Sequence, residues 1–166
     1  MLDLKSLRLV AGDARHEHPT VRMDPLLLGG QTYDVVPNEQ EVDVEVQAAS
    51  GGYYLTLRFA ARIEGPCYRC MEPARAEVVV DTSEYHASSA PQDDDELVSD
   101  YVADLQVDME RWARDSLVFA LPDKILCRPD CIGLCPRCGE RLEAGVEHTC
   151  GEEELDARWA KLRDLL

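Results

Sequence analysis

The clearest pattern in this chain is a regular alternation of apolar and polar side chains in its first half. Valine occupies every second position from Val42 to Val46, with charged residues between, which is typical of a strand with one buried face. The glycines of residues 50–52 predict a tight turn. Alternation then resumes from Tyr53 to Ile63, so the two segments predict an antiparallel hairpin.

A third strand is predicted beyond residue 73, because small and apolar side chains alternate with charged ones over residues 74–80. Gly65 and Pro66 end the preceding strand, which leaves Cys67 and Cys70 in the connecting turn. Two thiolates separated by two residues in a tight turn can bind one metal ion. A site at this tip needs a second pair of ligands from elsewhere in the chain.

Helical spacing replaces the alternation between Met109 and Leu121, where apolar side chains recur at i, i+3, i+4 and i+7. Asp108 is the predicted N-cap, Pro122 ends the pattern, and Trp112 is expected to pack on the sheet. The predicted fold is therefore α+β: an antiparallel β-sheet or partial barrel with one packed helix, a C-terminal zinc-knuckle module and a short terminal helix.

The remaining segments give weaker patterns. Residues 1–10 predict a strand or sheet edge, residues 98–102 a short strand, and residues 11–24 a loop. Residues 87–96 are small, polar and acidic, which indicates a loop or linker. Apolar spacing over residues 155–166 predicts an amphipathic helix, packed on the domain or offered to a partner.

Length and composition indicate one domain with a metal-bearing appendage. The chain has 166 residues, 45% of them hydrophobic and 30% charged. We assign residues 1–126 to the sheet and helix, and residues 127–166 to a zinc-knuckle segment and terminal helix packed on the same domain. No apolar run approaches the roughly 18 residues of a membrane span, and the first residues are charged, so we expect a cytoplasmic protein.

The formal net charge of -16 bears on the kind of partner. Because nucleic-acid affinity rests largely on cations that displace counterions, an acidic chain is repelled by phosphate backbones. The charge therefore favours a basic protein partner over direct contact with RNA. Simple solubility is the alternative explanation.

The candidate chemistry lies in seven cysteines and one nearby histidine. Paired cysteines in a reducing compartment favour metal ligands over disulfides, and an odd total argues against a complete disulfide set. Seven thiols and one imidazole equal the ligands of two tetrahedral zinc ions. The predicted ligands are Cys67, Cys70, Cys127, Cys131, Cys135, Cys138, His148 and Cys150.

Several partitions of these ligands are open. Our preferred partition pairs a local site with a long-range one, and Gly133 and Leu134 then form a hinge between two metals. The local set is Cys135, Cys138, His148 and Cys150, and the long-range set is Cys67, Cys70, Cys127 and Cys131. The simplest rival is a single zinc bound by Cys127, Cys131, Cys135 and Cys138. His16 and His18 have no cysteine nearby and are expected to be solvated.

The donor set predicts structural metal and no catalysis. A hydrolytic zinc keeps one position open for water, whereas thiolates saturate both candidate sites. A thioredoxin-type CxxC opens a helix, but the pattern after Cys70 is that of a strand, which disfavours a thiol oxidoreductase. The sequence contains no phosphate-binding glycine loop, nucleophile elbow or HExxH motif.

Taken together, the motifs resemble the YceD family, the large ribosomal RNA subunit accumulation proteins. The resemblance rests on the segment from Gly65 to Pro73, the helix end at residues 119–122, and the cysteine run from residue 127 to Gly139. Family members commonly have Cys-x-Cys where this chain has His148-Thr-Cys150, and histidine is an equivalent zinc ligand.

The resemblance implies a role in accumulation or processing of 23S ribosomal RNA and in large-subunit assembly, without established catalytic chemistry. The implied partners are ribosomal RNA or basic ribosomal proteins. We hypothesise contact through ribosomal proteins, or through a basic patch around the first CxxC formed by Arg58, Arg62, Arg69 and Arg75. The alternative function is a zinc-stabilised protein interaction module unconnected with the ribosome.

Overall fold

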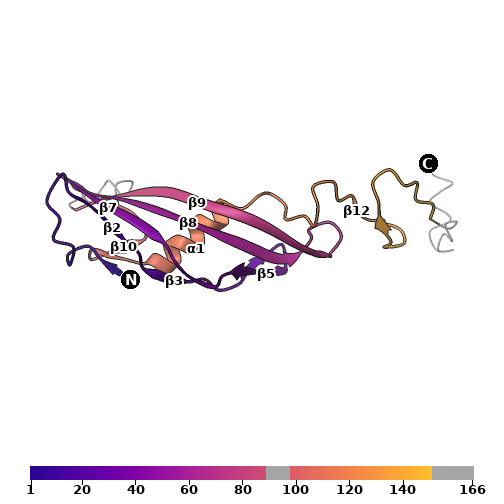
Figure 1. Cartoon of the computed structure of the whole chain (residues 1–166), viewed down its shortest axis with the longest axis horizontal. Helices are drawn as coiled ribbons and strands as arrows, with labels where there is room; N and C mark the ends of the chain where they lie inside the picture. The colour runs from indigo at the N-terminus through magenta and orange to yellow at the C-terminus, as the bar shows by residue number, and fades with distance from the viewer. Residues whose placement is uncertain (89–97, 151–166) are drawn as a thin grey trace, which may run out of the picture.

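A long antiparallel hairpin forms the axis of the protein (Figure 1). The computed structural model describes residues 1–88 and 98–150. Strands β8 (Gly52–Pro66) and β9 (Pro73–Ala87) each contain 15 residues and pair over their whole length, from Gly52 with Ala87 to Pro66 with Pro73. The hairpins predicted from alternation are therefore confirmed, and β9 is longer than predicted.

Four further strands of the described residues belong to this sheet, all on the side of β8 opposite β9. The sheet order is β2-β7-β8-β5-β4, with β9 paired to the other side of β8. Strand β7 pairs with the first half of β8, and β5 with residues 62–64 near its end. The bounds are β2 (Ala14–Glu17), β4 (Leu26–Leu28), β5 (Gln31–Val36) and β7 (Asp43–Ala49).

The other strands are short and form three small sheets. Strand β1 pairs with β11, which pairs with β10; β3 pairs with β6, and β12 with β13. Their bounds are β1 (Leu2–Asp3), β3 (Thr20–Arg22), β6 (Glu39–Glu41), β10 (Val102–Ala103), β11 (Gln106–Val107), β12 (Gly133–Leu134) and β13 (Arg141–Leu142).

Helix α1 (Met109–Phe119) lies along the sheet (Figure 1) and closes the core. The Asp108 carboxylate accepts a hydrogen bond from the Arg111 backbone N–H at 3.1 Å, as predicted for the N-cap. Trp112 and Leu117 are almost completely buried, together with Leu57 of β8. The predicted α+β class is confirmed: the described chain is mostly antiparallel sheet with one packed helix.

The predicted loop over residues 11–24 is wrong, because this segment contains β2 and β3. Strand β2 has the sequence Ala-Arg-His-Glu and is mostly exposed, so it lacks the apolar alternation that marks a half-buried strand. Its conformation comes from backbone pairing with β7, a contact over about thirty residues of chain. Local sequence carries no signal for such a polar edge strand.

Three other segments differ from their predictions. In residues 1–10 only Leu2–Asp3 is a strand, and a turn then buries Leu4 and Leu7 in the core. The short strand predicted at residues 98–102 instead begins at Val102. Of the predicted loop at 87–96, Ala87 belongs to β9 and residues 89–96 lie outside the described residues, as does the predicted terminal helix at 155–166.

His16 and His18 lie next to Asp43, on β7, and more than half of each side chain is exposed. The Asp43 carboxylate is 3.0 Å from His16 Nδ1, and this hydrogen bond lowers the pKa of Asp43 below its ordinary value. Neither histidine belongs to a metal-ligand cluster of the described residues. In residues 1–88 and 98–150, no helix has both the length and the apolar character to cross a bilayer.

We expect Trp112→Ala to lower the free energy of unfolding by about 3–5 kcal/mol, because it leaves a large cavity between α1 and the sheet. Urea denaturation of the whole chain measures this change. The control is Phe119→Ala on the same helix, where the side chain is 87% exposed and the change should stay within about 0.5 kcal/mol. Equal effects of the two substitutions would contradict the packing described here.

Candidate metal centres

The turn between β8 and β9 is a cysteine knuckle held by backbone hydrogen bonds. The Cys67 N–H donates to the Glu72 carbonyl at 2.7 Å, and the Met71 N–H donates to the Cys67 carbonyl at 3.0 Å. Met71 closes the loop with φ of 64°, in the left-handed region. The strand pair Pro66–Pro73 fixes both ends of the loop, so the two thiols project together from the tip of the hairpin.

Two further thiols from beyond α1 meet this pair. Cys67 Sγ lies 3.8 Å from Cys131 Sγ, and Cys70 Sγ lies 3.5 Å from Cys127 Sγ. All four sulfurs fall within 4.8 Å of one another. A tetrahedral ion with Zn–S bonds of about 2.3 Å separates its sulfurs by about 3.8 Å, so the first cluster has the dimensions of a four-thiolate metal site. A disulfide would bring a pair to about 2.05 Å, and all seven cysteines are free.

The second CxxC turn repeats the backbone geometry of the first. The Cys135 N–H donates to the Glu140 carbonyl at 2.7 Å, and the Gly139 N–H donates to the Cys135 carbonyl at 2.9 Å. Gly139 has φ of 73° and occupies the place that Met71 takes in the first loop. The two turns are thus the same knuckle, built once between long strands and once before the short strand β13.

His148 and Cys150 complete the second cluster. Cys135 Sγ lies 3.1 Å from Cys150 Sγ, and His148 Nε2 lies 3.2 Å from Cys138 Sγ and 3.1 Å from Cys150 Sγ. His148 Nδ1 faces the Glu140 carboxylate at 3.7 Å. A carboxylate beside Nδ1 favours the tautomer that carries its proton on Nδ1. The Nε2 lone pair then points at the thiols, which is the usual arrangement of a histidine ligand. The sequence did not mark Glu140, because acidic residues are frequent on this chain.

The thiols of each cluster differ in acidity. Burial raises the pKa of Cys67, but backbone N–H donors of Cys127, Arg69 and Cys70 outweigh burial and lower it to about 6. The backbone N–H of Cys138, together with Cys150 and Arg137, lowers the pKa of Cys135 to about 6. Each cluster therefore holds a thiolate at neutral pH.

In each cluster a second thiol, Cys127 in the first and Cys150 in the second, has a raised pKa and keeps its proton at neutral pH unless a cation replaces it. Burial, reinforced by the Cys70 thiol, raises the pKa of Cys127 to about 12. The Cys135 side chain, followed by burial, raises the pKa of Cys150 to about 12. A metal ion bound at either cluster would displace these protons, because its positive charge would offset the repulsion between neighbouring thiolates.

The first knuckle contacts the segment that leads to the second cluster. Gly133 has φ of 106°, and a Cβ there would lie 2.9 Å from the Arg69 carbonyl oxygen, so only glycine permits this approach. Arg69 also donates to the Cys131 carbonyl. Gly133 and Leu134, the predicted hinge, form β12, which pairs with β13. Arg141 of β13 lies 3.9 Å from Glu72 of the first knuckle.

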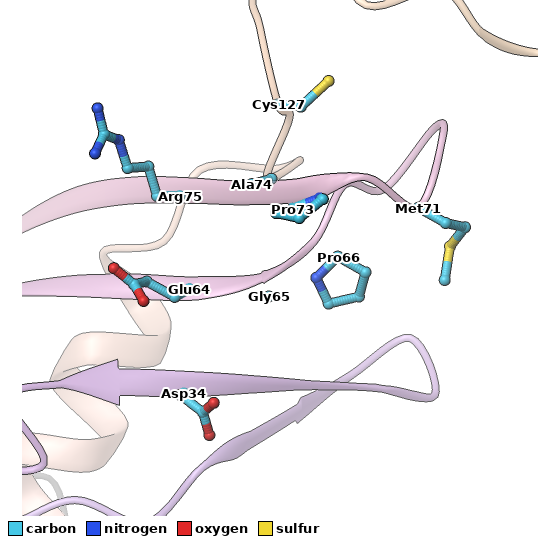
Figure 2. A pocket seen from close by; sticks show the side chains of 9 residues that line it. All are labelled: Asp34, Glu64, Gly65, Pro66, Met71, Pro73, Ala74, Arg75 and Cys127. Carbon is cyan, nitrogen blue, oxygen red and sulfur yellow. The ribbon is translucent and has the colours of Figure 1, made fainter. Parts of the chain in front are cut away.

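A hollow of about 560 Å³ lies beside the first cluster (Figure 2). Asp34, Glu64 and Arg75 form one row across β5, β8 and β9, and Cys127 also lines the hollow. Arg62 lies 2.7 Å from Glu64 and offsets part of the repulsion between the two adjacent carboxylates. The hollow contains a thiol that belongs to the cluster but, among its lining residues, no histidine or hydroxyl that could act with it as a nucleophile and base.

All eight predicted ligands fall into two groups of four that could each hold a metal ion. The first contains Cys67, Cys70, Cys127 and Cys131, and the second contains Cys135, Cys138, His148 and Cys150. The rival set of Cys127, Cys131, Cys135 and Cys138 is not brought together, because α1 returns the chain to the hairpin tip before residue 127 and the second knuckle lies beyond it (Figure 1).

The four arginines of the hypothesised basic patch do not form a free cationic surface around the first knuckle. Arg58 lies on the middle of β8 and contacts Asp43, Glu45 and Asp81 at 3.4–3.8 Å. Arg62 pairs with Glu64, and Arg69 points to the Cys131 carbonyl. Three of the four guanidinium groups are therefore already engaged within the protein.

Comparison with known proteins identifies relatives of this chain. A protein of Mycobacterium tuberculosis strain H37Rv, described as uncharacterised, is 36% identical over 129 residues, covering 76% of this chain and 61% of the relative. An uncharacterised protein of Mycobacterium leprae is 30% identical over 132 residues, covering 75% of this chain and 58% of the relative. This chain thus spans about three fifths of the length of these relatives. No solved structure matches it.

The family model for the large ribosomal RNA subunit accumulation protein YceD matches residues 55–166, about two thirds of the chain. The match begins in β8 and includes both cysteine clusters. The resemblance noted from the sequence motifs is confirmed, and this chain belongs to the YceD family.

Proposed function

We propose that this protein is a non-catalytic, zinc-binding factor for accumulation or processing of 23S ribosomal RNA and for assembly of the large ribosomal subunit. The observation that carries the proposal is the family match, which covers residues 55–166 and contains all eight candidate ligands. A cytoplasmic location follows from this role.

Zinc is the proposed metal because the donors are seven cysteine sulfurs and one histidine nitrogen. Soft thiolates with imidazole in sets of four are the usual ligands of structural zinc. Both sets are complete without water, so neither leaves the open position that a hydrolytic zinc requires. The metal would tie the hairpin tip to residues 127–131 and fold the second knuckle, where few apolar side chains are buried.

A non-catalytic role is also favoured over thiol oxidoreductase activity by the surroundings of both CxxC turns. A redox CxxC stands at a helix N-terminus, which lowers the thiol pKa. Here β9 begins three residues after Cys70 and β13 three residues after Cys138. The low pKa of Cys67 and Cys135 instead comes from the knuckle N–H groups, which also stabilise metal-bound thiolate.

We propose basic ribosomal proteins as the direct partners, in preference to bare RNA. The net charge is -16, and Arg58, Arg62 and Arg69 are held by groups of the protein itself. Phosphate backbones therefore meet an acidic surface with few free guanidinium groups near the first knuckle. An acidic protein steers a basic partner to its surface by long-range attraction.

The proposed role predicts that the full-length protein sediments with precursors of the large ribosomal subunit in gradients of cell extract. Cells depleted of the protein are expected to contain less mature 23S ribosomal RNA relative to 16S, as measured by quantitative northern analysis. A protein that stays at the top of the gradient while precursors are present, with unchanged 23S levels on depletion, would favour the interaction module unconnected with the ribosome.

Native mass spectrometry is expected to find two zinc ions per chain, since each cluster forms a complete tetrahedral set. Cys70→Ser should leave one ion, Cys138→Ser should leave one, and the double variant should leave none. His16→Gln and His18→Gln, which change histidines outside both clusters, should keep two. A single ion in the unchanged protein would refute the two-site assignment.

Gly139→Ala is expected to weaken zinc retention by the second cluster about tenfold, because an L side chain in the left-handed region costs about 1–2 kcal/mol. Chelator competition at the second site, in protein carrying Cys70→Ser, measures the change. Gly29→Ala is the matched control. Gly29 has φ of 57° and lies in the β4–β5 turn, so alanine there adds the same kind of backbone strain away from the cluster. Equal zinc retention by the two variants would contradict the role given to Gly139.

A further inference from the structure

The outer side of β9 is a long sheet edge. Strand β9 pairs with β8 on one side, and among the described residues no strand or backbone hydrogen bond reaches the other side. Alternate residues of β9 therefore direct N–H and C=O groups away from the sheet. Natural sheets usually protect such an edge with proline, lysine or a bulge. Residues 74–87 contain neither proline nor lysine, and their uninterrupted pairing with β8 shows that this strand has no bulge.

A groove runs along this edge, between β9 and the end of α1. It has a volume of about 330 Å³ and is lined by consecutive residues from Val79 to Thr82 and by Phe119 and Ala120 of the helix end. Phe119 is 87% exposed and Val79 is 75% exposed, which is unusual for large apolar side chains that lie on either side of one groove. An unpaired strand edge beside a groove flanked by exposed apolar side chains is the arrangement by which a protein adds an extended peptide as a new strand.

The charges around the groove are acidic. Glu84 lines it, and Glu77 and Asp81 lie on the exposed face of the same strand. Asp81 contacts Arg58, whereas Glu77 and Glu84 have no ion-pair partner among the described residues. Tyr101 lines the opposite wall, and its pKa is raised by burial and then by the nearby carboxylates of Asp115 and Glu84.

These acidic residues argue against pairing between two copies of this chain. An antiparallel pairing of β9 with itself centred on Val79 would place Glu77 opposite Asp81 twice, and like charges directly opposite are destabilising. Each copy also has a net charge of -16. The same carboxylates would stabilise lysine or arginine side chains on an added strand.

We propose that the outer edge of β9, with the groove beneath Phe119, binds an extended segment of a basic protein as an additional strand of the sheet. The segment alternates apolar side chains, which pack against Phe119 and the groove, with lysine or arginine side chains, which lie on the exposed face of the sheet with Glu77 and Asp81. The identity of the partner rests on the proposed function: if the protein acts in large-subunit assembly, the bound segments are extended basic segments of large-subunit proteins.

The test uses the full chain and a labelled synthetic peptide of alternating valine and lysine as the probe. We expect saturable binding in fluorescence anisotropy, and slower hydrogen exchange of alternate backbone amides of β9 in the complex. The same peptide with N-methylated amides along one edge should bind at least about tenfold more weakly, because it keeps the charge but cannot pair with β9. A peptide with glutamate in place of lysine should not bind.

Matched variants separate the groove from the rest of the surface. Phe119→Ala should weaken binding of the peptide about tenfold, as expected for an aromatic anchor, while Leu27→Ala, a 72% exposed residue of β4, should leave it unchanged. Glu77→Lys should weaken binding more than Glu41→Lys, a charge reversal on β6. Circular dichroism confirms that each variant keeps its fold.

The proposal would be overturned if the N-methylated peptide bound as tightly as the unmodified one, or if the peptide slowed hydrogen exchange only outside β9. It would also be overturned if the outward-facing β9 amides already exchanged slowly in the free protein, or if the protein formed a dimer that Phe119→Ala dissociates. Failure of peptide binding while the protein still sediments with subunit precursors would count against this edge alone. Peptide binding without such sedimentation would count against the ribosomal role alone.

Discussion

The continuous pairing of β8 with β9 is the constraint on which the rest of the structure depends. Because 15 residues of each strand pair without interruption, the register places Pro66 opposite Pro73 and closes a loop of fixed geometry between them. The backbone of this loop positions the two thiols of Cys67 and Cys70 at the tip of the hairpin. The same pairing leaves the far side of β9 as the sheet edge.

Helix α1 determines which residues can reach that tip. Burial of Trp112 and Leu117 against the sheet aligns the helix along the hairpin, so the chain that leaves α1 returns to the knuckle and delivers Cys127 and Cys131. Between residues 132 and 150, the described residues that follow, few apolar side chains are buried, and Cys138 is itself exposed. In such a segment metal ligation would supply the free energy that a hydrophobic core supplies elsewhere.

Negative charge predominates in this protein. The guanidinium groups of Arg58 and Arg62 are neutralised by neighbouring carboxylates on the exposed face of the sheet, so the excess of acidic residues dominates the surface. Within the two clusters, backbone N–H donors of the knuckles lower the pKa of Cys67 and Cys135 to about 6, so these thiols also carry negative charge at neutral pH. An acidic surface attracts basic molecules through long-range electrostatics.

The sequence by itself determined the elements whose signal is local: the alternation of β7 and β8, the capped helix after Asp108, and the two CxxC turns, whose spacing alone brings two sulfurs together. It also supplied the eight candidate ligands. Only the tertiary structure decided how they group, because the meeting of Cys127 and Cys131 with the hairpin tip depends on the packing of α1. Strands β2 and β3 escaped prediction for the same reason, since polar edge strands such as β2 owe their conformation to backbone pairing with distant residues and carry no apolar pattern of their own.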